Sequence, residues 1–209
     1  MQKIIGLTGT YCAGKNHVAA YLERRGLPVL DVDKWGHVVL EKERESVFAR
    51  FGDDLENADG TVNRRLLGKR VFGAPLELAA LEDIVHPAAN RLTEEWIANQ
   101  SGTCVINAAL LHKTCVFERL DFIILARASV FTRLRRARLR DGLSWPELLR
   151  RFASQRNFNP QYLSGKADIY RVENPGFVRK PGLAASDPQR LSAKLERRID
   201  EILSTEGIL

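Results

Sequence analysis

Residues 4–22 combine two glycines and a lysine in the spacing that a phosphate-binding loop requires. Gly9, Gly14 and Lys15 fit the pattern G-x-x-x-x-G-K-[ST] between a buried strand and a helix. The glycines let such a loop wrap a phosphate with its backbone N–H groups, the helix presents its positive end, and the lysine reaches the β- and γ-phosphates. The last position departs from the pattern, because Asn16 stands where a hydroxyl normally holds magnesium. The stretch predicts phosphate binding, and the alternative is a strand-to-helix turn with incidental glycines.

An acidic pair lies in the second apolar segment, residues 27–33. Asp31 and Asp33 alternate, so we expect them to point to opposite sides of a strand. Asp33, at the end, can overhang the phosphate loop, where a kinase needs a carboxylate to orient the acceptor hydroxyl and take its proton. An aspartate there also suits the N-cap of a helix that begins at Lys34 or Trp35. These residues alone leave the two roles open.

Arginines concentrate in one part of the chain, which has a net charge of +6 and a pI near 9.4. Between residues 133 and 156 there are eight of them, at positions 133, 135, 136, 138, 140, 150, 151 and 156. Such a segment can face nucleic acid, bind a polyanionic small molecule, or form a solvated helix face. Phe131, Trp145, Phe152 and Phe158 are spaced like core residues, which disfavours base stacking on nucleic acid.

The composition is that of an ordinary globular chain. Its 209 residues can bury the core of one domain with a sizeable insertion. We find no apolar run of the ~20 residues that a membrane span needs and no cleavable signal pattern, so we expect a cytoplasmic protein. Cys12, Cys104 and Cys115 match no zinc or redox motif, so we expect reduced thiols.

Short apolar segments and helical patterns alternate along the chain. The predicted strands are residues 3–8, 27–33, 103–111, 121–126 and 167–174. The predicted helices are residues 15–25, 129–140, 145–157 and 187–204, together with a mostly helical block, 34–101, that breaks at 52–60 and 73–75 and has Asn63 near one helix start. This alternation predicts an α/β fold with a doubly wound parallel sheet.

The elements place the polar residues at one edge of the sheet. Ligands of such folds bind at the carboxyl ends of the strands, where we expect Gly9, Asp33 and Asn107 to lie. The predicted core consists of residues 1–33, 102–128 and 158–209, with a helical insertion over about 34–101 and an Arg-rich lid over about 129–157.

Six motifs in order resemble one family. They read IGLTGTYCAGK, GLPVLDVDKWGHVV, DGTVNRRLLGKRVF, LEDIVHP, LRDGLSWPELLRRFASQ and KADIYRVENPG, and they cover nearly the whole chain. Together they resemble the dephospho-CoA kinases. The resemblance implies a P-loop kinase fold with about five strands. It also implies ATP-dependent phosphorylation of the ribose 3′-hydroxyl of dephospho-CoA, the last step of CoA synthesis.

The resemblance also implies roles for individual residues. Asp33 would be the general base, and Arg64 and His86 would help to place the acceptor in the insertion. Arg140 of the lid, with Lys15, would act on the transferring phosphates, and Asn174 would lie near the adenine. Arg136 is the second lid arginine that we single out. The loop residues expected to bind ATP are Gly9, Cys12, Ala13, Gly14, Lys15, Asn16 and His17. Asn16 is the expected Mg²⁺ ligand. The implied partners are small-molecule substrates rather than nucleic acid or a membrane, with a monomer or weak homo-oligomer.

Several positions depart from the family pattern. Asn16 and His17 stand where the family has Ser and usually Thr, while Ala109 and Lys113 replace a proline and an acid. The amide oxygen of Asn16 is hard enough for Mg²⁺ but is held farther from the backbone than a serine hydroxyl, so we expect weaker or altered metal use. The alternatives are another P-loop nucleoside or nucleotide kinase, a homologue with reduced activity, and a non-enzymatic nucleotide- or nucleic-acid-binding module.

Overall fold

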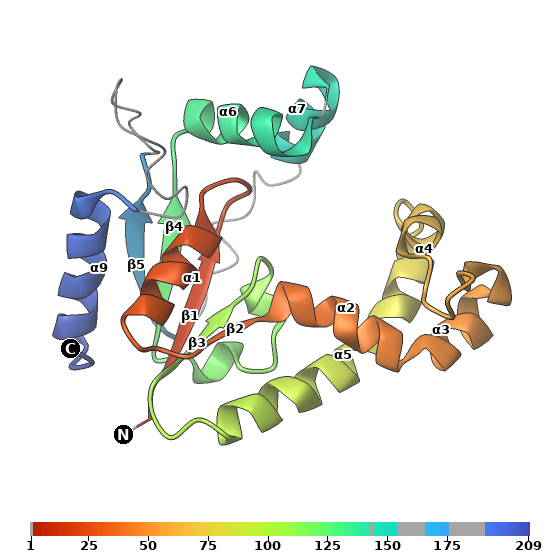
Figure 1. Ribbon diagram of the computed structural model, residues 1–209, viewed down its shortest axis with the longest axis horizontal. Coiled ribbons are helices and arrows are strands. Elements are labelled where there is room, and N and C mark those ends of the chain that lie inside the picture. Colours follow the sequence, from red (N-terminus) through yellow and green to blue (C-terminus); the bar gives the residue numbers. More distant parts are fainter. Residues whose placement is uncertain (1, 143, 154–165, 176–190) are drawn as a thin grey trace. The chain divides into compact units, whose positions relative to one another are not determined.

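The computed structural model describes residues 2–142, 144–153, 166–175 and 191–209. These residues form two compact units (Figure 1). The larger unit comprises Met1–Leu30 and Gln100–Leu209, and the smaller one is Asp31–Asn99. None of the helices in the described ranges combines the length and the apolar character that a membrane span requires.

A five-stranded sheet forms the centre of the fold, in the order β2-β3-β1-β4-β5. The strands are β1 (Ile4–Gly9), β2 (Val29–Asp31), β3 (Cys104–Asn107), β4 (Phe122–Arg127) and β5 (Asp168–Glu173). β1 pairs in parallel with β3 and β4, and β4 pairs in parallel with β5. The predicted α/β fold class is therefore confirmed, and the carboxyl ends of β1 and β3 meet at one edge of the sheet.

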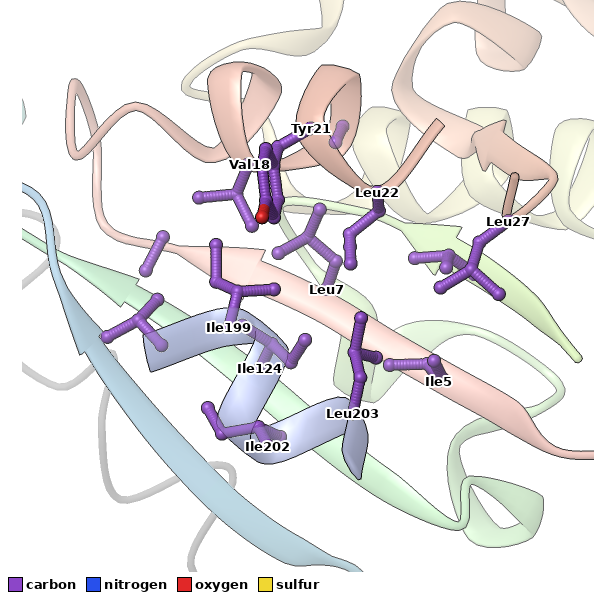
Figure 2. Close-up of a cluster of buried hydrophobic side chains, with 14 of the residues drawn as sticks. Ile5, Leu7, Val18, Tyr21, Leu22, Leu27, Ile124, Ile199, Ile202 and Leu203 are labelled. Atoms are coloured by element: carbon purple, nitrogen blue, oxygen red, sulfur yellow. The ribbon is translucent and has the colours of Figure 1, made fainter. Parts of the chain in front are cut away.

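Two helices cover one face of this sheet, α1 (Lys15–Arg24) and α9 (Ala193–Thr205). Figure 2 shows their apolar side chains turned toward the strands: Val18, Tyr21 and Leu22 from α1, and Ile199, Ile202 and Leu203 from α9, against Ile5, Leu7 and Ile124. A polar contact closes the edge of this cluster, because the Tyr21 hydroxyl donates to Asp200 at 2.8 Å. Both helices are thus held on the sheet, and the start of α1 is fixed beside the end of β1.

The larger unit also contains, within its described residues, α6 (Val130–Asp141), α7 (Trp145–Ala153) and the short 3₁₀ turns η2 (Leu111–Lys113) and η3 (Phe117–Arg119). The strand predicted over 103–111 ends at Asn107, and η2 folds back across the sheet beside Gly6. A Cβ on Gly6 would lie 2.7 Å from Cδ2 of Leu111, so that side chain would have to move to admit any other residue. The segments predicted as helical at 154–157 and 187–190 lie outside the described residues.

The aromatic residues of α6 and α7 do not follow the predicted core spacing. Phe131 is 77% exposed and Trp145 is 55% exposed, so the expectation that they face the core is wrong. Phe152 is half-buried and packs edge-on against the Tyr11 ring, with the ring centroids 5.7 Å apart. Phe158 lies outside the described residues. The nucleic-acid alternative therefore has to be judged from the arginines instead.

The smaller unit is helical and has a core of its own. It contains α2 (Val32–Lys42), α3 (Arg44–Phe51), the 3₁₀ turn η1 (Asp53–Leu55), α4 (Arg64–Val71) and α5 (Pro75–Ala98). Its buried cluster consists of Leu40, Val47, Phe51, Leu55, Val62, Leu67 and Val71. Asn63, predicted to lie near a helix start, is the N-cap of α4 and accepts a hydrogen bond from the Leu66 amide at 3.0 Å.

Candidate active site

The predicted phosphate loop joins β1 to α1, and its backbone explains both glycines. Gly14 has φ +91°, and a Cβ there would lie 2.2 Å from the Asn174 amide nitrogen. A Cβ on Gly9 would lie 2.8 Å from the Ala126 carbonyl oxygen. Cys12 also adopts a positive φ, +59°, which is uncommon for a residue with a side chain. The loop is therefore held in one conformation by close neighbours.

The start of α1 is suited to an anion. Lys15 is the first helical residue, and the N-cap residue Gly14 offers no side-chain hydrogen bond to the first turn. The leading N–H groups and the positive end of the helix are features that bind phosphate. Lys15 and His17 are half-buried here, and Asn16 is exposed. Behind them, Val18 is fully buried and fixes the helix to the sheet.

The back of the loop rests on α6. The Arg133 Nε donates to the Tyr11 carbonyl at 2.9 Å. One Nη of Arg136 donates to the carbonyls of Cys12 at 3.2 Å and Ala13 at 3.0 Å. Arg133 was not singled out from the sequence. Its spacing from Arg136 places both on one face of a helix, and that spacing is the signal that could have identified it.

Asn174 also lies behind the loop. It follows β5 directly, is only 6% exposed, and its Nδ2 donates to the Ala13 carbonyl at 3.1 Å. Its Oδ1 accepts a hydrogen bond from Arg136 at 3.1 Å. The adenine contact that the resemblance implies for Asn174 stays a prediction. What the structure shows is an amide bonded to the loop backbone.

Arg140, the lid arginine predicted to act on the phosphates, contacts the loop residue Tyr11. Its guanidinium is 5.1 Å from the centroid of the Tyr11 ring, and its Nε donates to Asp141 at 2.7 Å. The Tyr11 hydroxyl bonds to the same carboxylate. Tyr11 is thus a residue that sequence reasoning missed. A large aromatic side chain within a glycine-bounded loop was the only signal for it.

The side-chain oxygen of Asn107 is a buried polar atom at the carboxyl end of β3. The residue is 1% exposed, and its Oδ1 has no hydrogen-bond partner among the described residues. Because Asn107 follows Val105 by two positions, it shares the face of the sheet that α1 covers. The amide oxygens of Asn107 and Asn16 are each of the type that Mg²⁺ accepts, directly or through water. The described residues contain no group of three His, Cys, Asp or Glu that could hold a metal by themselves.

The local structure around the two aspartates differs from the predicted strand over residues 27–33. β2 ends at Asp31 and α2 begins at Val32, so Asp33 is an exposed residue of a first helical turn, not the end of a strand. The N-cap is Asp31, whose carboxylate accepts from the Lys34 amide at 3.3 Å. The two aspartates therefore do not point to opposite sides of one strand, and Asp33 is not the N-cap of α2.

The other two predicted acceptor residues also lie in the smaller unit. Arg64 is the first residue of α4, His86 lies within α5, and both side chains are exposed. α4 and α5 pack against each other, and Leu67 and Val71 of α4 are buried in the unit's core. The helices thus hold both residues at the surface of a folded unit. Their roles stay predictions.

Known proteins resemble the chain over most of its length. A family model described as dephospho-CoA kinase matches residues 3–169. The dephospho-CoA kinase of Treponema pallidum (strain Nichols) is 32% identical over 99% of this chain and 96% of its own length. The dephospho-CoA kinase of Shouchella clausii is 35% identical over 82% of this chain and 89% of its own length.

Solved structures agree on the fold. The protein TT1252 from Thermus thermophilus superposes with a TM-score of 0.79 at 29% identity, covering 98% of this chain and 97% of that one. A shikimate kinase from Bacteroides thetaiotaomicron, at 14% identity and a TM-score of 0.53, covers 98% of both chains and shares the fold alone. The predicted P-loop kinase-type fold is confirmed. Because the family model spans most of the chain and the relatives match it at more than 30% identity, the chain belongs to the dephospho-CoA kinase family.

Proposed function

We propose that this chain transfers the γ-phosphoryl group of ATP to the ribose 3′-hydroxyl of dephospho-CoA, giving CoA and ADP. The observation that carries the proposal is the loop between β1 and α1, with a left-handed Gly14 and Lys15 at the start of an uncapped helix. Its N–H groups and lysine are suited to bind the phosphates of ATP. Membership of the dephospho-CoA kinase family identifies dephospho-CoA as the acceptor.

In this mechanism Asp33 is the general base. Its carboxylate takes the proton of the 3′-hydroxyl, and the oxygen forms a bond to the γ-phosphorus. The bond from the γ-phosphorus to the bridging oxygen breaks, and ADP leaves with that oxygen. Arg64 and His86 would hold the acceptor. Asp33, Arg64 and His86 are all exposed side chains, which suits contact with a ligand.

Lys15 and Arg140 neutralise charge on the phosphates. Phosphoryl transfer depends on positioning and charge stabilisation more than on covalent chemistry. Arg133, Arg136 and Arg140 follow the spacing i, i+3, i+7 and all contact residues of the loop, although Arg140 is as exposed as Arg135 and Arg138. The loop-directed arginines favour a small polyanion over nucleic acid as the partner of this segment.

The proposal includes magnesium, with Asn16 as its protein ligand. When bound, the ion would supply positive charge that offsets the charge on the phosphates. The exposed amide of Asn16, in the first turn of α1, is the side chain that would hold it. Asn107 would support it through its buried Oδ1, which can accept a hydrogen bond from water.

We extend the proposal to a reducing compartment such as the cytoplasm, because Cys12, Cys104 and Cys115 are thiols rather than members of disulfides. A monomer or weak homo-oligomer remains part of it and can be checked by sedimentation at several protein concentrations.

The test follows CoA formation from ATP and dephospho-CoA with Mg²⁺. Asp33→Asn should lower kcat by about 10²–10⁴-fold, since it removes a general base, and should leave ATP affinity unchanged. Asp31→Asn is the matched control, because asparagine caps a helix as well as aspartate does and activity should persist. An Asp33→Asn enzyme with normal turnover would refute the role of Asp33. An absence of CoA from the unaltered enzyme with several divalent metals would refute the function.

A further inference from the structure

Three consecutive carbonyl groups at the back of the phosphate loop accept hydrogen bonds from one helix. These are the carbonyls of Tyr11, Cys12 and Ala13, bound by Arg133 and Arg136 of α6 at 2.9–3.2 Å. In a trans peptide the C=O and the following N–H point in opposite directions. Fixing these carbonyls toward α6 therefore turns the N–H groups of the next residues away from it.

The N–H groups that follow the carbonyls held by Arg136 are those of Ala13 and Gly14. The amide of Ala13 donates to the Thr10 carbonyl at 2.9 Å and closes a turn of the loop. The amide of Gly14 follows the Ala13 carbonyl, so Arg136 sets its direction. A phosphate in the loop would meet this donor already oriented, at a lower cost in backbone entropy than in a mobile loop.

Burial and charge set Arg133 and Arg136 apart from the other arginines of α6. Both are half-buried, and desolvation lowers the pKa of each guanidinium. Carbonyl and amide oxygens, rather than carboxylates, accept the hydrogen bonds described for them. Their positive charge is therefore not neutralised within these bonds and adds to the attraction of the loop for an anion.

Asn174 ties Arg136 to the sheet. Its backbone amide donates to the Arg127 carbonyl at 2.7 Å, next to the end of β4. Its side chain accepts from Arg136 and donates to the Ala13 carbonyl, each at 3.1 Å. The amide nitrogen occupies the space that a Cβ on Gly14 would need. The sheet, the arginine and the loop are thus joined by one buried asparagine.

We propose that Arg136, supported by Asn174, is a positioning residue that acts on ATP through the backbone of the phosphate loop and not through the adenine. The inference rests on the proposed binding of ATP phosphates in this loop. It gives α6 a second task beside carrying Arg140: the same helix that delivers the lid arginine keeps the loop N–H groups in place.

The test separates the phosphates of ATP from its base. Calorimetry measures the affinity for inorganic tripolyphosphate, and ligand-observed NMR measures the affinity for adenosine. Arg136→Met should lower tripolyphosphate affinity about 10–100-fold and leave adenosine affinity unchanged, since a charge-assisted hydrogen bond contributes about 1.5–3 kcal/mol. Arg135→Met, which removes an exposed charge from the same helix, is the control and should change neither.

Two further variants separate geometry from charge and guard against misfolding. Arg136→Lys keeps the charge but loses the fork that reaches both carbonyls and Asn174, so tripolyphosphate affinity should still fall several-fold. Asn174→Ala should act in the same direction. Amide exchange of Ala13, whose N–H bonds to the Thr10 carbonyl, should become faster in both variants because the loop is held less firmly. These milder variants test the proposal even if Arg136→Met does not fold.

The outcomes are distinct. Unchanged tripolyphosphate affinity in folded Arg136→Lys and Asn174→Ala would overturn the proposal, as would a loss confined to adenosine, which would place these residues at the base. If the unaltered protein does not bind tripolyphosphate at all, the phosphate role of the loop fails first, and the proposed function fails with it.

Discussion

At the scale of single residues, two asparagines are the side chains through which we propose that the site uses magnesium. Asn16 lies in the first turn of α1, and Asn107 lies buried at the end of β3. Both side chains are neutral, so neither supplies the negative charge that strengthens Mg²⁺ binding. Changes at these two positions therefore test the proposed use of magnesium.

Asn16→Ser tests the metal contact directly. A serine hydroxyl lies closer to the backbone than the asparagine amide, so we expect tighter metal use, seen as a several-fold lower Mg²⁺ concentration for half-maximal activity. Calorimetric titration of ADP at several Mg²⁺ concentrations gives the same answer without turnover. Identical Mg²⁺ dependence in the two proteins would show that residue 16 does not hold the ion.

Asn107→Leu tests the buried acceptor. An unpaired buried polar atom costs about 1–3 kcal/mol, so an apolar side chain of similar size should leave the ligand-free protein as stable or about 1 kcal/mol more stable. The extra stability that Mg²⁺ and ATP confer should shrink. Urea denaturation with and without nucleotide measures both. A less stable ligand-free variant would mean that Asn107 has a structural task instead.

The spacing of Gly9, Gly14 and Lys15 was enough to predict the loop, because the backbone demand is local. The physical reason for Gly14 was not predictable, since the amide that excludes a side chain comes from Asn174, far along the chain. Tyr11 shows the same limit. Its partner Asp141 becomes a neighbour only when α6 packs beside the loop.

At the scale of elements, the boundary between β2 and α2 could not be predicted from the residue pattern. Asp31 and Asp33 alternate in the sequence, which is equally compatible with a strand end and with the N-cap and second residue of a helix. The structure ends β2 at Asp31 because its carboxylate caps α2. The strand predicted over 103–111 is shortened for a tertiary reason, because η2 packs onto Gly6 of β1.

The end of α9 is tied to the sheet by a polar contact that should respond to pH. Glu206 accepts from the Tyr170 hydroxyl of β5 at 2.6 Å and from the Lys3 ammonium at 3.0 Å. These bonds, Tyr170 first, hold the pKa of Glu206 below its usual value. A lowered pKa in the folded state means stability that is present above the unfolded pKa, about 4.3, and is lost as the pH falls through the folded value.

Glu206→Gln should therefore destabilise the protein at pH 7 by about 1 kcal/mol, or roughly 2–4 °C in Tm. The difference from the unaltered protein should shrink as the pH falls below 4. Thermal unfolding at pH 7, 5 and 3.5 measures it. Arg198→Gln is a fitting control, because its ion pair with Glu201 is exposed and worth little. A difference that stays constant with pH would show that the carboxylate charge is not what stabilises the contact.

At the scale of the whole molecule, the two compact units divide the proposed chemistry. The larger unit carries the phosphate loop and its supports, and the smaller unit carries Asp33, Arg64 and His86. Each unit has its own buried cluster, so a cavity in one need not loosen the other. A destabilising substitution in one core should then weaken only the ligand binding that its own unit carries.

Leu55→Ala and Ile199→Ala are the matched pair that tests this division. Leu55 is fully buried in the core of the smaller unit, and Ile199 is fully buried between α9 and the sheet. Each substitution should cost about 2–5 kcal/mol in its own unit. Leu55→Ala should raise amide exchange within Asp31–Asn99 and weaken dephospho-CoA binding while tripolyphosphate affinity stays unchanged. Ile199→Ala should raise exchange in the larger unit and weaken tripolyphosphate binding. If Leu55→Ala lowers both affinities equally, the units unfold as one, and the acceptor half of the function cannot be assigned to the smaller unit alone.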